Sequence, residues 1–367
     1  MKINFIDLQK QYINMKQEID NRILSVLEST MFIQGKEVNE LDEGLAQYIG
    51  SNYAISCSSG TDALLLALMS IGVGPGDEVI TTPFTFFATA EVISFLGAKP
   101  VFVDIDPESY NIDANLIERY ITNNTKAIIP VSLYGQPADM DEINQIAMKH
   151  NLIVIEDAAQ SFGAEYKGKK SGNLSTIGCT SFFPSKPLGC YGDGGAIFTN
   201  DTEIAEKARV LMNHGQTERY KHKYIGINGR LDAIQAAILN VKLKYFSNEV
   251  MKRWEIGQRY TTLLNSMNNT IITPAILPDR TSVYAQYSIR VPNREEVIKG
   301  LNTEGIPTAI HYPIPLYKQE VYQDLNINPE DYPVTEKVSK EIMSLPISPY
   351  LTIEEQDLII EKLSECL

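Results

Sequence analysis

Short runs of apolar and β-branched residues alternate with helical patterns between residues 53 and 200. Seven runs have the length and composition of buried strands: Tyr53–Cys57, Glu78–Thr82, Pro100–Asp104, Ala127–Val131, Ile153–Asp157, Thr180–Phe183 and Ala196–Thr199. Four segments between them repeat apolar residues at helical spacing: Thr61–Ile71, Thr89–Phe95, Ala114–Tyr120 and Met140–His150. Strands that alternate with helices build a largely parallel sheet with helices on its faces. This part of the chain predicts an α/β domain.

The pattern changes after Gly229–Asp232. A long helical pattern runs from there through Ala236 and Leu243 towards Tyr260 and predicts a linking helix. Beyond it we expect a strand, a helix and an amphipathic helix near the carboxyl end: Tyr284–Val291, Glu295–Glu304 and Glu354–Leu363. The sequence therefore predicts a large domain over residues 1–245 and a smaller α+β domain over residues 246–367.

Composition narrows the classes of function. The 367 residues carry 32 basic and 46 acidic side chains, a formal charge of −14. Clustered Lys and Arg supply the affinity for nucleic acids and anionic membranes, so neither is an expected partner. A single small anion in a locally basic pocket stays possible, because net charge averages over the whole surface.

Targeting and redox signals favour a cytoplasmic protein. Lys2 and Asp7 interrupt the stretch where a signal peptide would need apolar residues. No apolar run approaches the ~20 residues that span a bilayer. The four cysteines form no CxxC pair, and no His/Cys cluster offers metal ligands, so neither a disulfide framework nor a metal is expected.

The first segment with candidate chemistry is Ser58–Asp62, which ends a strand and opens an apolar helix. Free N–H groups and the helix dipole make such a start an anion site, here at Gly60 and Thr61. The alternative is an ordinary N-cap made by Thr61 or Ser59.

The second segment is Ile153–Gln160. Its apolar residues predict a buried parallel strand, and Asp157 stands at the carboxyl end, where open α/β sheets bind ligands. A buried unpaired carboxylate is costly, so Asp157 needs a cation or a cofactor beside it, unless it is a solvated strand end.

The third segment, Thr180–Gly189, carries Lys186 among Phe, Pro, Leu and Gly. Partial burial would free its amine for Schiff-base chemistry, although most lysines lie on surfaces. The glycines at 192–195 allow tight turns, but they form no G-x-G-x-x-G fingerprint, which disfavours a nicotinamide oxidoreductase.

One cofactor satisfies all three segments. A phosphate suits the helix start at Gly60, a ring nitrogen suits Asp157, and an aldehyde suits Lys186. Pyridoxal 5′-phosphate carries these three groups, and its enzymes pair a Schiff-base lysine with an acidic or basic partner of the pyridine nitrogen.

These motifs resemble the DegT/DnrJ/EryC1/StrS nucleotide-sugar aminotransferases. The resemblance rests on Asp157–Gln160, on Ser181–Lys186 followed by Gly192–Gly195, and on Gly226–Asp232, and it extends from Phe5 to the carboxyl terminus. It implies the fold type I of pyridoxal-phosphate enzymes, which is aspartate aminotransferase-like. The large domain would then hold a mostly parallel, seven-stranded sheet.

The resemblance also implies roles for individual residues. Lys186 would be the catalytic residue, Asp157 would keep the ring nitrogen protonated, and Phe86 would stack on the ring, although alone it would be taken for a core residue. The positions that match the family's cofactor-binding residues are Gly60, Thr61, Phe86, Asp157, Gln160, Ser181, Lys186 and Asn228. By analogy Asn228 reaches the phosphate of the neighbouring subunit, so a homodimer with shared active sites is expected.

The substrate is expected to be a nucleotide sugar. The segments 184–195, 282–287 and 311–316 are similar to members that aminate C3′ of a UDP-linked N-acetylhexosamine uronic acid, with L-glutamate as the donor by resemblance, for O-antigen synthesis. Arg230, His311 and Tyr312 are the candidate substrate contacts, and Arg230 is alternatively an interface ion pair near Asp232. The alternatives are C4′ or C3′ amination of another UDP- or dTDP-linked keto sugar, and a non-catalytic cofactor-binding regulator.

Overall fold

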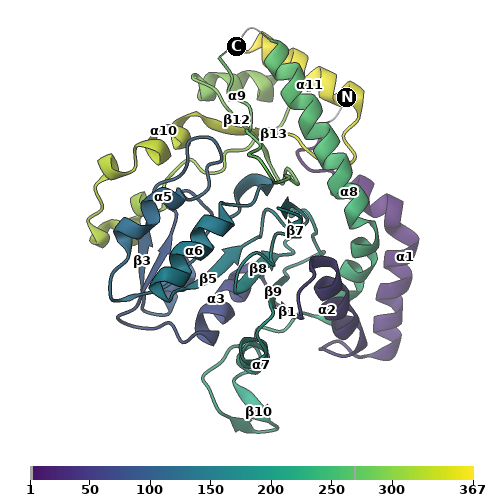
Figure 1. Ribbon diagram of the computed structural model, residues 1–367. Helices are drawn as coiled ribbons and strands as arrows, with labels where there is room; N and C mark the ends of the chain where they lie inside the picture. The colour runs from purple at the N-terminus through teal and green to yellow at the C-terminus, as the bar shows by residue number, and fades with distance from the viewer. Residues whose placement is uncertain (1–2, 268–269) are drawn as a thin grey trace.

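The computed structural model describes residues 3–267 and 270–367, and a seven-stranded sheet lies at its centre (Figure 1). The strand order is β1-β9-β8-β5-β4-β2-β3. The strands are β1 (Tyr53–Cys57), β2 (Glu78–Thr81), β3 (Lys99–Phe102), β4 (Thr125–Ile128), β5 (Ile153–Asp157), β8 (Ile177–Ser181) and β9 (Gly195–Thr199). Only β9 among them runs antiparallel to its neighbours, β1 and β8. The predicted α/β fold with a mostly parallel sheet is confirmed.

Both faces of the sheet are buried, which explains the apolar runs. The helices around it are α2 (Lys36–Ile49), α3 (Gly60–Ser70), α4 (Ala88–Phe95), α5 (Ala114–Ile117), α6 (Met140–His150) and α7 (Thr202–Leu211). Ile55, Val79 and Ile155 face α3, α4 and α7, whereas Ala54 and Val154 face the helices on the opposite side. Successive residues of a strand point to opposite faces, so most positions of these strands are covered, and Lys99 at the start of the edge strand β3 is exposed.

The strand and helix ends differ from the sequence pattern in a few places. β8 begins at Ile177, and the chain leaves the sheet at Phe182, so the predicted strand over 180–183 is displaced toward the carboxyl end. The predicted helix over 114–120 is a single turn, α5, that tightens into a 3-10 turn over Glu118–Tyr120. The predicted strand over 284–291 is shorter, because only Tyr287–Arg290 pair as β12.

A second group of elements lies at one end of the sheet, beside the two termini in Figure 1. It contains β12 (Tyr287–Arg290), β13 (Ile342–Leu345), α9 (Arg294–Thr303), α10 (Pro333–Glu341) and α11 (Ile353–Glu365). The antiparallel pair β12–β13 packs on α9 and α11 and forms a separate core with Tyr260 and Leu264. Tyr260 and Leu264 belong to α8 (Ala233–Ser266), which also packs on α2 beside the sheet.

Helix α8 therefore joins the two cores. It is continuous for 34 residues, and residue 245, where we place the domain boundary, lies within it. Helix α1 (Leu8–Ser29) packs along α8 through Met15 and Ile19 (Figure 1).

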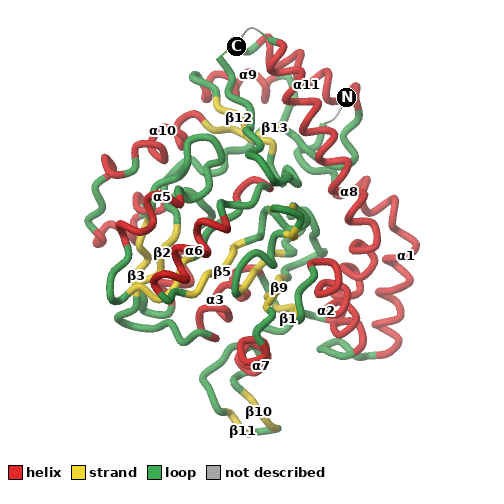
Figure 2. Tube along the Cα trace, viewed as in Figure 1, coloured by secondary structure: helices red, strands yellow, loops and turns green. Residues whose placement is uncertain are grey.

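Two small hairpins complete the fold, β6–β7 (Glu165–Tyr166, Lys169–Lys170) and β10–β11 (Gln216–Glu218, Lys221–His222). The hairpin β10–β11 extends away from the body of the molecule beyond α7 (Figure 2). Within the described residues, no helix is both long and apolar enough to cross a membrane.

Candidate active site

A cavity of about 490 Å³ opens where the carboxyl ends of the parallel strands meet the starts of α3 and α4. Open α/β sheets bind their ligands at this edge. Most of the residues that the sequence singles out line it: Gly60, Thr61, Phe86, Asp157, Gln160, Ser181, Lys186, His311 and Tyr312. His311 and Tyr312 come from the loop after α9, so the cavity lies between the sheet and the second group of elements.

The start of α3 forms one end of the cavity. Ser59 is the N-cap, because its Oγ accepts a hydrogen bond from the Asp62 N–H at 3.0 Å. A Cβ atom on Gly60 would lie 2.6 Å from Ser181 Cβ, so glycine is needed for α3 to close against β8. The first N–H groups of a helix have no partner within it, and here they lie with Ser181 at the cavity wall. An anion such as a phosphate fits this end.

Asp157 lies at the centre of the cavity wall, and only 6% of it is exposed. Its two oxygens accept hydrogen bonds from Thr89 Oγ1 at 3.0 Å and from the Ala159 N–H at 3.1 Å. Burial raises the pKa of this carboxyl, and the two hydrogen bonds and the charge of Lys186 partly oppose the shift. The solvated strand end that the sequence left open is therefore wrong, and the carboxylate is held ready for a cation.

Lys186 lines the same cavity. Burial lowers the pKa of its ammonium, whereas the charge of Asp157 raises it in part. Its backbone N–H is bonded to Phe183 O at 2.8 Å, which closes a tight turn after β8. A lysine with a lowered pKa beside a fixed carboxylate suits nucleophilic amine chemistry.

Gln160 connects two loops of the site. Its side-chain oxygen accepts a hydrogen bond from the Tyr134 N–H at 2.8 Å, and its Nε2 donates to the Tyr312 hydroxyl at 3.1 Å. The hydroxyl of Tyr134 donates to the carbonyl of His311. Burial and the charge of Lys186 lower the pKa of His311 to about 4, so its ring is neutral at physiological pH. These bonds fix Tyr312 and His311 over the cavity.

Phe86 is 56% exposed, so the alternative that it is a core side chain is wrong. Its ring lies 6.3 Å from that of Tyr312 across the cavity mouth. A flat aromatic ligand between the sheet edge and this pair of rings fits the space by stacking.

Two of the predicted residues do not line this cavity. Asn228 is exposed and pairs through its backbone with Asn213, and Arg230 Nη1 donates to the side-chain oxygen of Asn213. Arg230 Nε is buried without a hydrogen-bond partner among the described residues. None of the ion pairs of the described residues includes Arg230, and the alternative of an interface ion pair near Asp232 involves a second subunit and stays a prediction.

The comparisons with known proteins decide the family. A family model described as the DegT/DnrJ/EryC1/StrS aminotransferase family matches residues 13–364. The chain belongs to this aminotransferase family. Its members use pyridoxal 5′-phosphate, and the cavity fits that cofactor, because it combines the start of α3, which suits an anion, with Lys186 and with a buried carboxylate that forms no ion pair among the described residues.

Three similar proteins show how far the likeness extends. The chain is 55% identical over 349 residues to a UDP-2-acetamido-2-deoxy-3-oxo-D-glucuronate aminotransferase of Pseudomonas aeruginosa, which covers 95% of this chain and 96% of the relative. It is 47% identical to a pleiotropic regulatory protein of Geobacillus stearothermophilus, over 100% and 98% of the two chains. The solved structure of NtdA from Bacillus subtilis with bound cofactor PMP superposes with a TM-score of 0.92 at 34% identity, over 100% of this chain and 85% of that one.

Sequence reasoning did not single out three residues that line the cavity of this aminotransferase or hold its side chains in place. Thr89 fixes Asp157, the Tyr134 N–H fixes Gln160, and Gln286 lines the cavity from the segment before β12. Thr89 lies in the first turn of α4, and its hydroxyl lies 3.3 Å from that of Thr85, which precedes the helix by three residues. Tyr134 acts through its backbone, which leaves no signal in the side-chain pattern.

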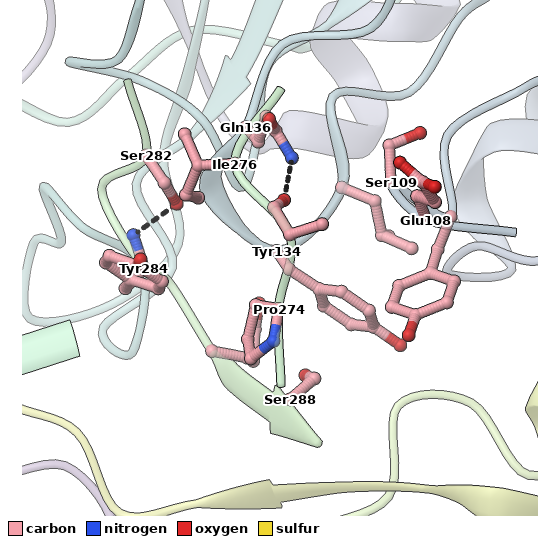
Figure 3. A pocket seen from close by; sticks show the side chains of 13 residues that line it. Glu108, Ser109, Tyr134, Gln136, Pro274, Ile276, Ser282, Tyr284 and Ser288 are labelled. Atoms are coloured by element: carbon pink, nitrogen blue, oxygen red, sulfur yellow. Dashed lines mark hydrogen bonds between the residues drawn. The ribbon is translucent and has the colours of Figure 1, made fainter. Parts of the chain in front are cut away.

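A second cavity, of only about 20 Å³, adjoins the first at Gln286, and Figure 3 shows the residues that line it. Tyr134, Ser282, Tyr284 and Ser288 line it, and Gln286 lines both cavities. At this size it holds about one water molecule and no cofactor.

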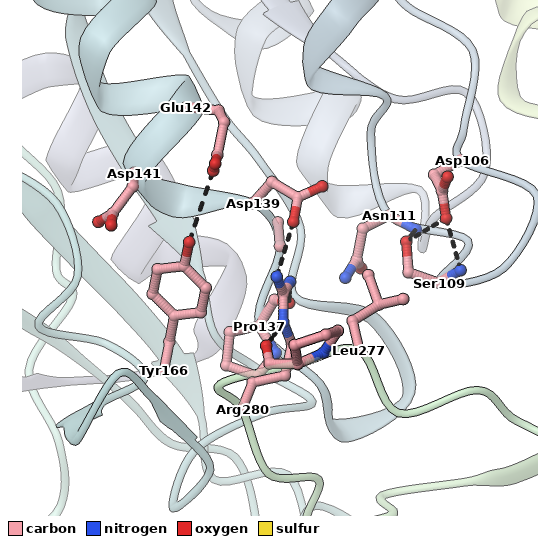
Figure 4. A network of polar contacts seen from close by, with 12 residues as sticks. Asp106, Ser109, Asn111, Pro137, Asp139, Asp141, Glu142, Tyr166, Leu277 and Arg280 are labelled. Carbon is pink, nitrogen blue, oxygen red and sulfur yellow. Dashed lines mark hydrogen bonds and ion pairs between the residues drawn. The ribbon is translucent and has the colours of Figure 1, made fainter.

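The segment 274–281 borders this cavity and is hydrogen-bonded to the loop before α6 in the part of the molecule that contains the central sheet (Figure 4). Arg280 donates to Asp139 Oδ1 at 2.8 Å and to Pro137 O at 2.9 Å, and the Leu277 N–H donates to the Gln136 side chain at 2.7 Å. This polar network holds the two halves together beside the active site.

Proposed function

We propose that the chain transfers an amino group from L-glutamate to C3′ of a UDP-linked 3-keto-N-acetylhexosamine uronic acid. The observation that carries the proposal is the placement of Lys186 and Asp157 in one cavity with the start of α3. The 55% identity to the Pseudomonas aeruginosa relative supports the choice of sugar. In the overall reaction glutamate becomes 2-oxoglutarate, and the ketone at C3′ becomes an amine.

The cofactor-binding residues follow from the geometry of the cavity. Gly60, Thr61 and Ser181 would hold the phosphate, Asp157 the ring nitrogen, and Phe86 the face of the ring. When bound, the cofactor supplies an electron sink that stabilises negative charge on the carbon next to the nitrogen. Gln160 would lie near the ring oxygen, held in place by the Tyr134 N–H.

Lys186 is the catalytic residue of the proposal. Its Nζ takes the proton from Cα of the amino donor and later delivers a proton to C3′ of the sugar. Its lowered pKa makes the neutral amine accessible for the first step. Asp157 remains ionised beside the cationic ring nitrogen, because an opposite charge at hydrogen-bond distance favours the carboxylate. His311 and Tyr312 bind the sugar as neutral hydrogen-bonding groups.

Asn228 and Arg230 act, in this proposal, in the cavity of a second subunit. Neither lines the cavity of its own chain, and the adjoining segment 31–33 exposes Met31, Phe32 and Ile33 by 58%, 43% and 51%. The Ala233 N–H is bonded to Phe32 O, so this apolar surface adjoins the segment that carries Arg230. A contiguous exposed apolar patch is typical of a subunit interface. A homodimer with shared active sites covers it and gives Arg230 a carboxylate to bind.

The test is direct amination by the purified protein reconstituted with pyridoxal phosphate. We expect it to form 2-oxoglutarate and a 3-amino sugar from glutamate and the UDP-linked 3-keto uronic acid, with the position of the amine determined by NMR. Lys186→Ala abolishes this activity, and Lys169→Ala, which removes an exposed lysine, preserves it. Transfer to 4-keto sugars or to dTDP sugars instead would favour the alternative substrates.

A non-catalytic regulator is the second candidate, since the Geobacillus relative is named as a regulatory protein. It requires cofactor binding without amino transfer to any keto sugar, so the same assay distinguishes the two. The cavity holds a complete set of reacting groups, which favours the enzyme. We further propose that the enzyme is cytoplasmic and serves O-antigen or another surface polysaccharide.

A further inference from the structure

Lys242 is a buried lysine that the proposed reaction does not use. It lies in α8, and only 1% of it is exposed. No ion pair with a carboxylate is formed by Lys242 among residues 3–267 and 270–367. Burial lowers the pKa of its ammonium to about 8, partly opposed by the charge of Glu249. A buried ammonium without a carboxylate is costly, so its contacts need an explanation.

Both contacts of the ammonium are with the loop that carries Lys186. Lys242 Nζ donates to the carbonyl of Gly189 at 2.6 Å, and it lies 4.2 Å from the centre of the Tyr191 ring. Gly189 follows Lys186 by three residues. A charge-assisted hydrogen bond and a cation–π contact therefore hold this loop from the helix that links the two halves of the molecule.

A second side chain of α8 binds the same loop. Gln235 lies two turns before Lys242 on the same face, and its side-chain oxygen accepts a hydrogen bond from the Tyr191 N–H at 2.9 Å. Helix α8 thus holds the loop at two positions, Gly189 and Tyr191, one on each side of Cys190.

The loop is tight enough to transmit this hold to Lys186. A Cβ atom on Gly189 would lie 2.5 Å from Pro184 O and 2.8 Å from Phe183 O, so the chain folds back directly on the residues before Lys186. The Lys186 N–H is itself bonded to Phe183 O at 2.8 Å. A displacement of Gly189 therefore displaces the turn from which the Lys186 side chain extends.

We propose that Lys242 is a positioning residue, which fixes the position of the turn that carries Lys186 through its hydrogen bond to the carbonyl of Gly189. This proposal rests on the role assigned to Lys186 above. It explains why a polar residue occupies a fully buried position of α8. Reacting groups lose about 100-fold in rate when they are misplaced by about 1 Å, so a positioning residue acts on the rate of the chemical step.

The test compares Lys242→Met with Lys244→Met. Lys244 lies on the same helix, but it is exposed and forms a surface ion pair with Glu18, so it is a matched control. The first readout is the half-reaction of the holoenzyme with its amino donor, followed by cofactor absorbance, because this step does not depend on the identity of the sugar. We expect Lys242→Met to lower its maximal rate about 10- to 100-fold, with the half-saturating donor concentration changed less than about 3-fold. Lys244→Met retains the wild-type rate.

The second readout is amide hydrogen exchange of the full-length protein, with and without pyridoxal phosphate. We expect Lys242→Met to speed exchange in the loop 183–191 and to leave the sheet unchanged. Gln235→Leu, the second variant, speeds exchange at 190–192 and lowers the rate in the same direction. Wild-type rate and exchange in both variants would overturn the proposal, as would faster exchange spread over the whole chain. Failure to aminate the sugar, with a normal donor half-reaction in the wild type, would count against the proposed substrate alone.

Discussion

Replacing Asp157 by asparagine separates two effects of this carboxylate, which destabilises the protein without cofactor and stabilises the bound cofactor. Without a cofactor, the charge is buried, and within the part of the chain that the structure describes it accepts hydrogen bonds from Thr89 and from the Ala159 N–H. Burial raises its pKa above the unfolded value, so its stabilising contribution is complete only below the unfolded pKa and is lost as pH rises through the folded pKa. At neutral pH the charge therefore destabilises the apo protein. Asparagine removes that cost and keeps both bonds, since its amide can donate to Thr89 Oγ1.

With the cofactor present the sign reverses. The carboxylate forms a charge-assisted hydrogen bond to the ring nitrogen, which is worth about 1.5–3 kcal/mol. Loss of this interaction corresponds to a decrease of about 10- to 150-fold in cofactor affinity. Asp157→Asn thus raises the melting temperature of the apo protein while it weakens binding of pyridoxal phosphate.

The assay is thermal unfolding of the apo protein together with titration by pyridoxal phosphate under equilibrium conditions. Asp193→Asn is the control, because Asp193 also lines the cavity but is exposed at its rim. We expect a change in affinity of less than about 3-fold for this control, since exposed charges are screened by water. Unchanged cofactor affinity in Asp157→Asn would refute the assignment of Asp157 to the ring nitrogen.

Three further predictions test other parts of the site. The first mixes two inactive variants, Lys186→Ala and Arg230→Ala, which are unfolded and refolded together. If the active sites are shared, half of the dimers then hold one intact site, so the mixture should regain up to about a quarter of wild-type activity. No recovery of activity would place Arg230 outside the partner's site. His311 has a pKa of about 4 against an unfolded value of 6.5, so its contribution to stability is complete above pH 6.5 and is lost as pH falls to 4. His311→Gln should therefore reduce the fall in melting temperature between pH 6.5 and pH 4. An unchanged fall in melting temperature would contradict the lowered pKa of His311. Gly60→Ala places Cβ 2.6 Å from Ser181 Cβ, so it should lower the free energy of unfolding, measured with urea, by about 1–3 kcal/mol and should also weaken cofactor binding. A urea midpoint equal to that of the wild type would show that α3 can move away from β8.

The central sheet could be predicted from the sequence because its strands are covered on both faces. All seven predicted runs overlap strands of the sheet, and Met140–His150 is a helix with the predicted ends. The N-terminal helices were not predicted, although the signal for α1 exists: Gln11, Met15 and Ile19 are buried at intervals of four, behind an Asp7 cap. The antiparallel direction of β9 left no such signal, because period and composition do not depend on strand direction.

The candidate site was predictable for the groups that would act on the ligand and unpredictable for most of the partners that hold these groups in place. Lys186 and Asp157 carry groups that are unusual in apolar surroundings, which drew attention to them, and their roles followed from the three segments together and from the resemblance to the family. The partners that fix the site act through Thr89, through the backbone of Tyr134 and through the carbonyl of Gly189. Contacts of this kind depend on where loops meet in space, and a sequence pattern contains no distance between loops.

The acidic composition of this enzyme is compatible with anionic ligands because most of its surface charge is too far from the cavity to repel them. The formal charge of −14 is spread over the whole surface, and charges on it are screened beyond about 8 Å at physiological ionic strength. A phosphate at the start of α3 would instead lie within hydrogen-bond distance of backbone N–H groups, and Lys186 lines the same cavity. The carboxylate of Asp157 is also there, and burial raises its pKa, so a cationic ring nitrogen beside it would stabilise its charged form. Local donors therefore decide what binds, whereas net charge decides only which large surfaces the protein avoids.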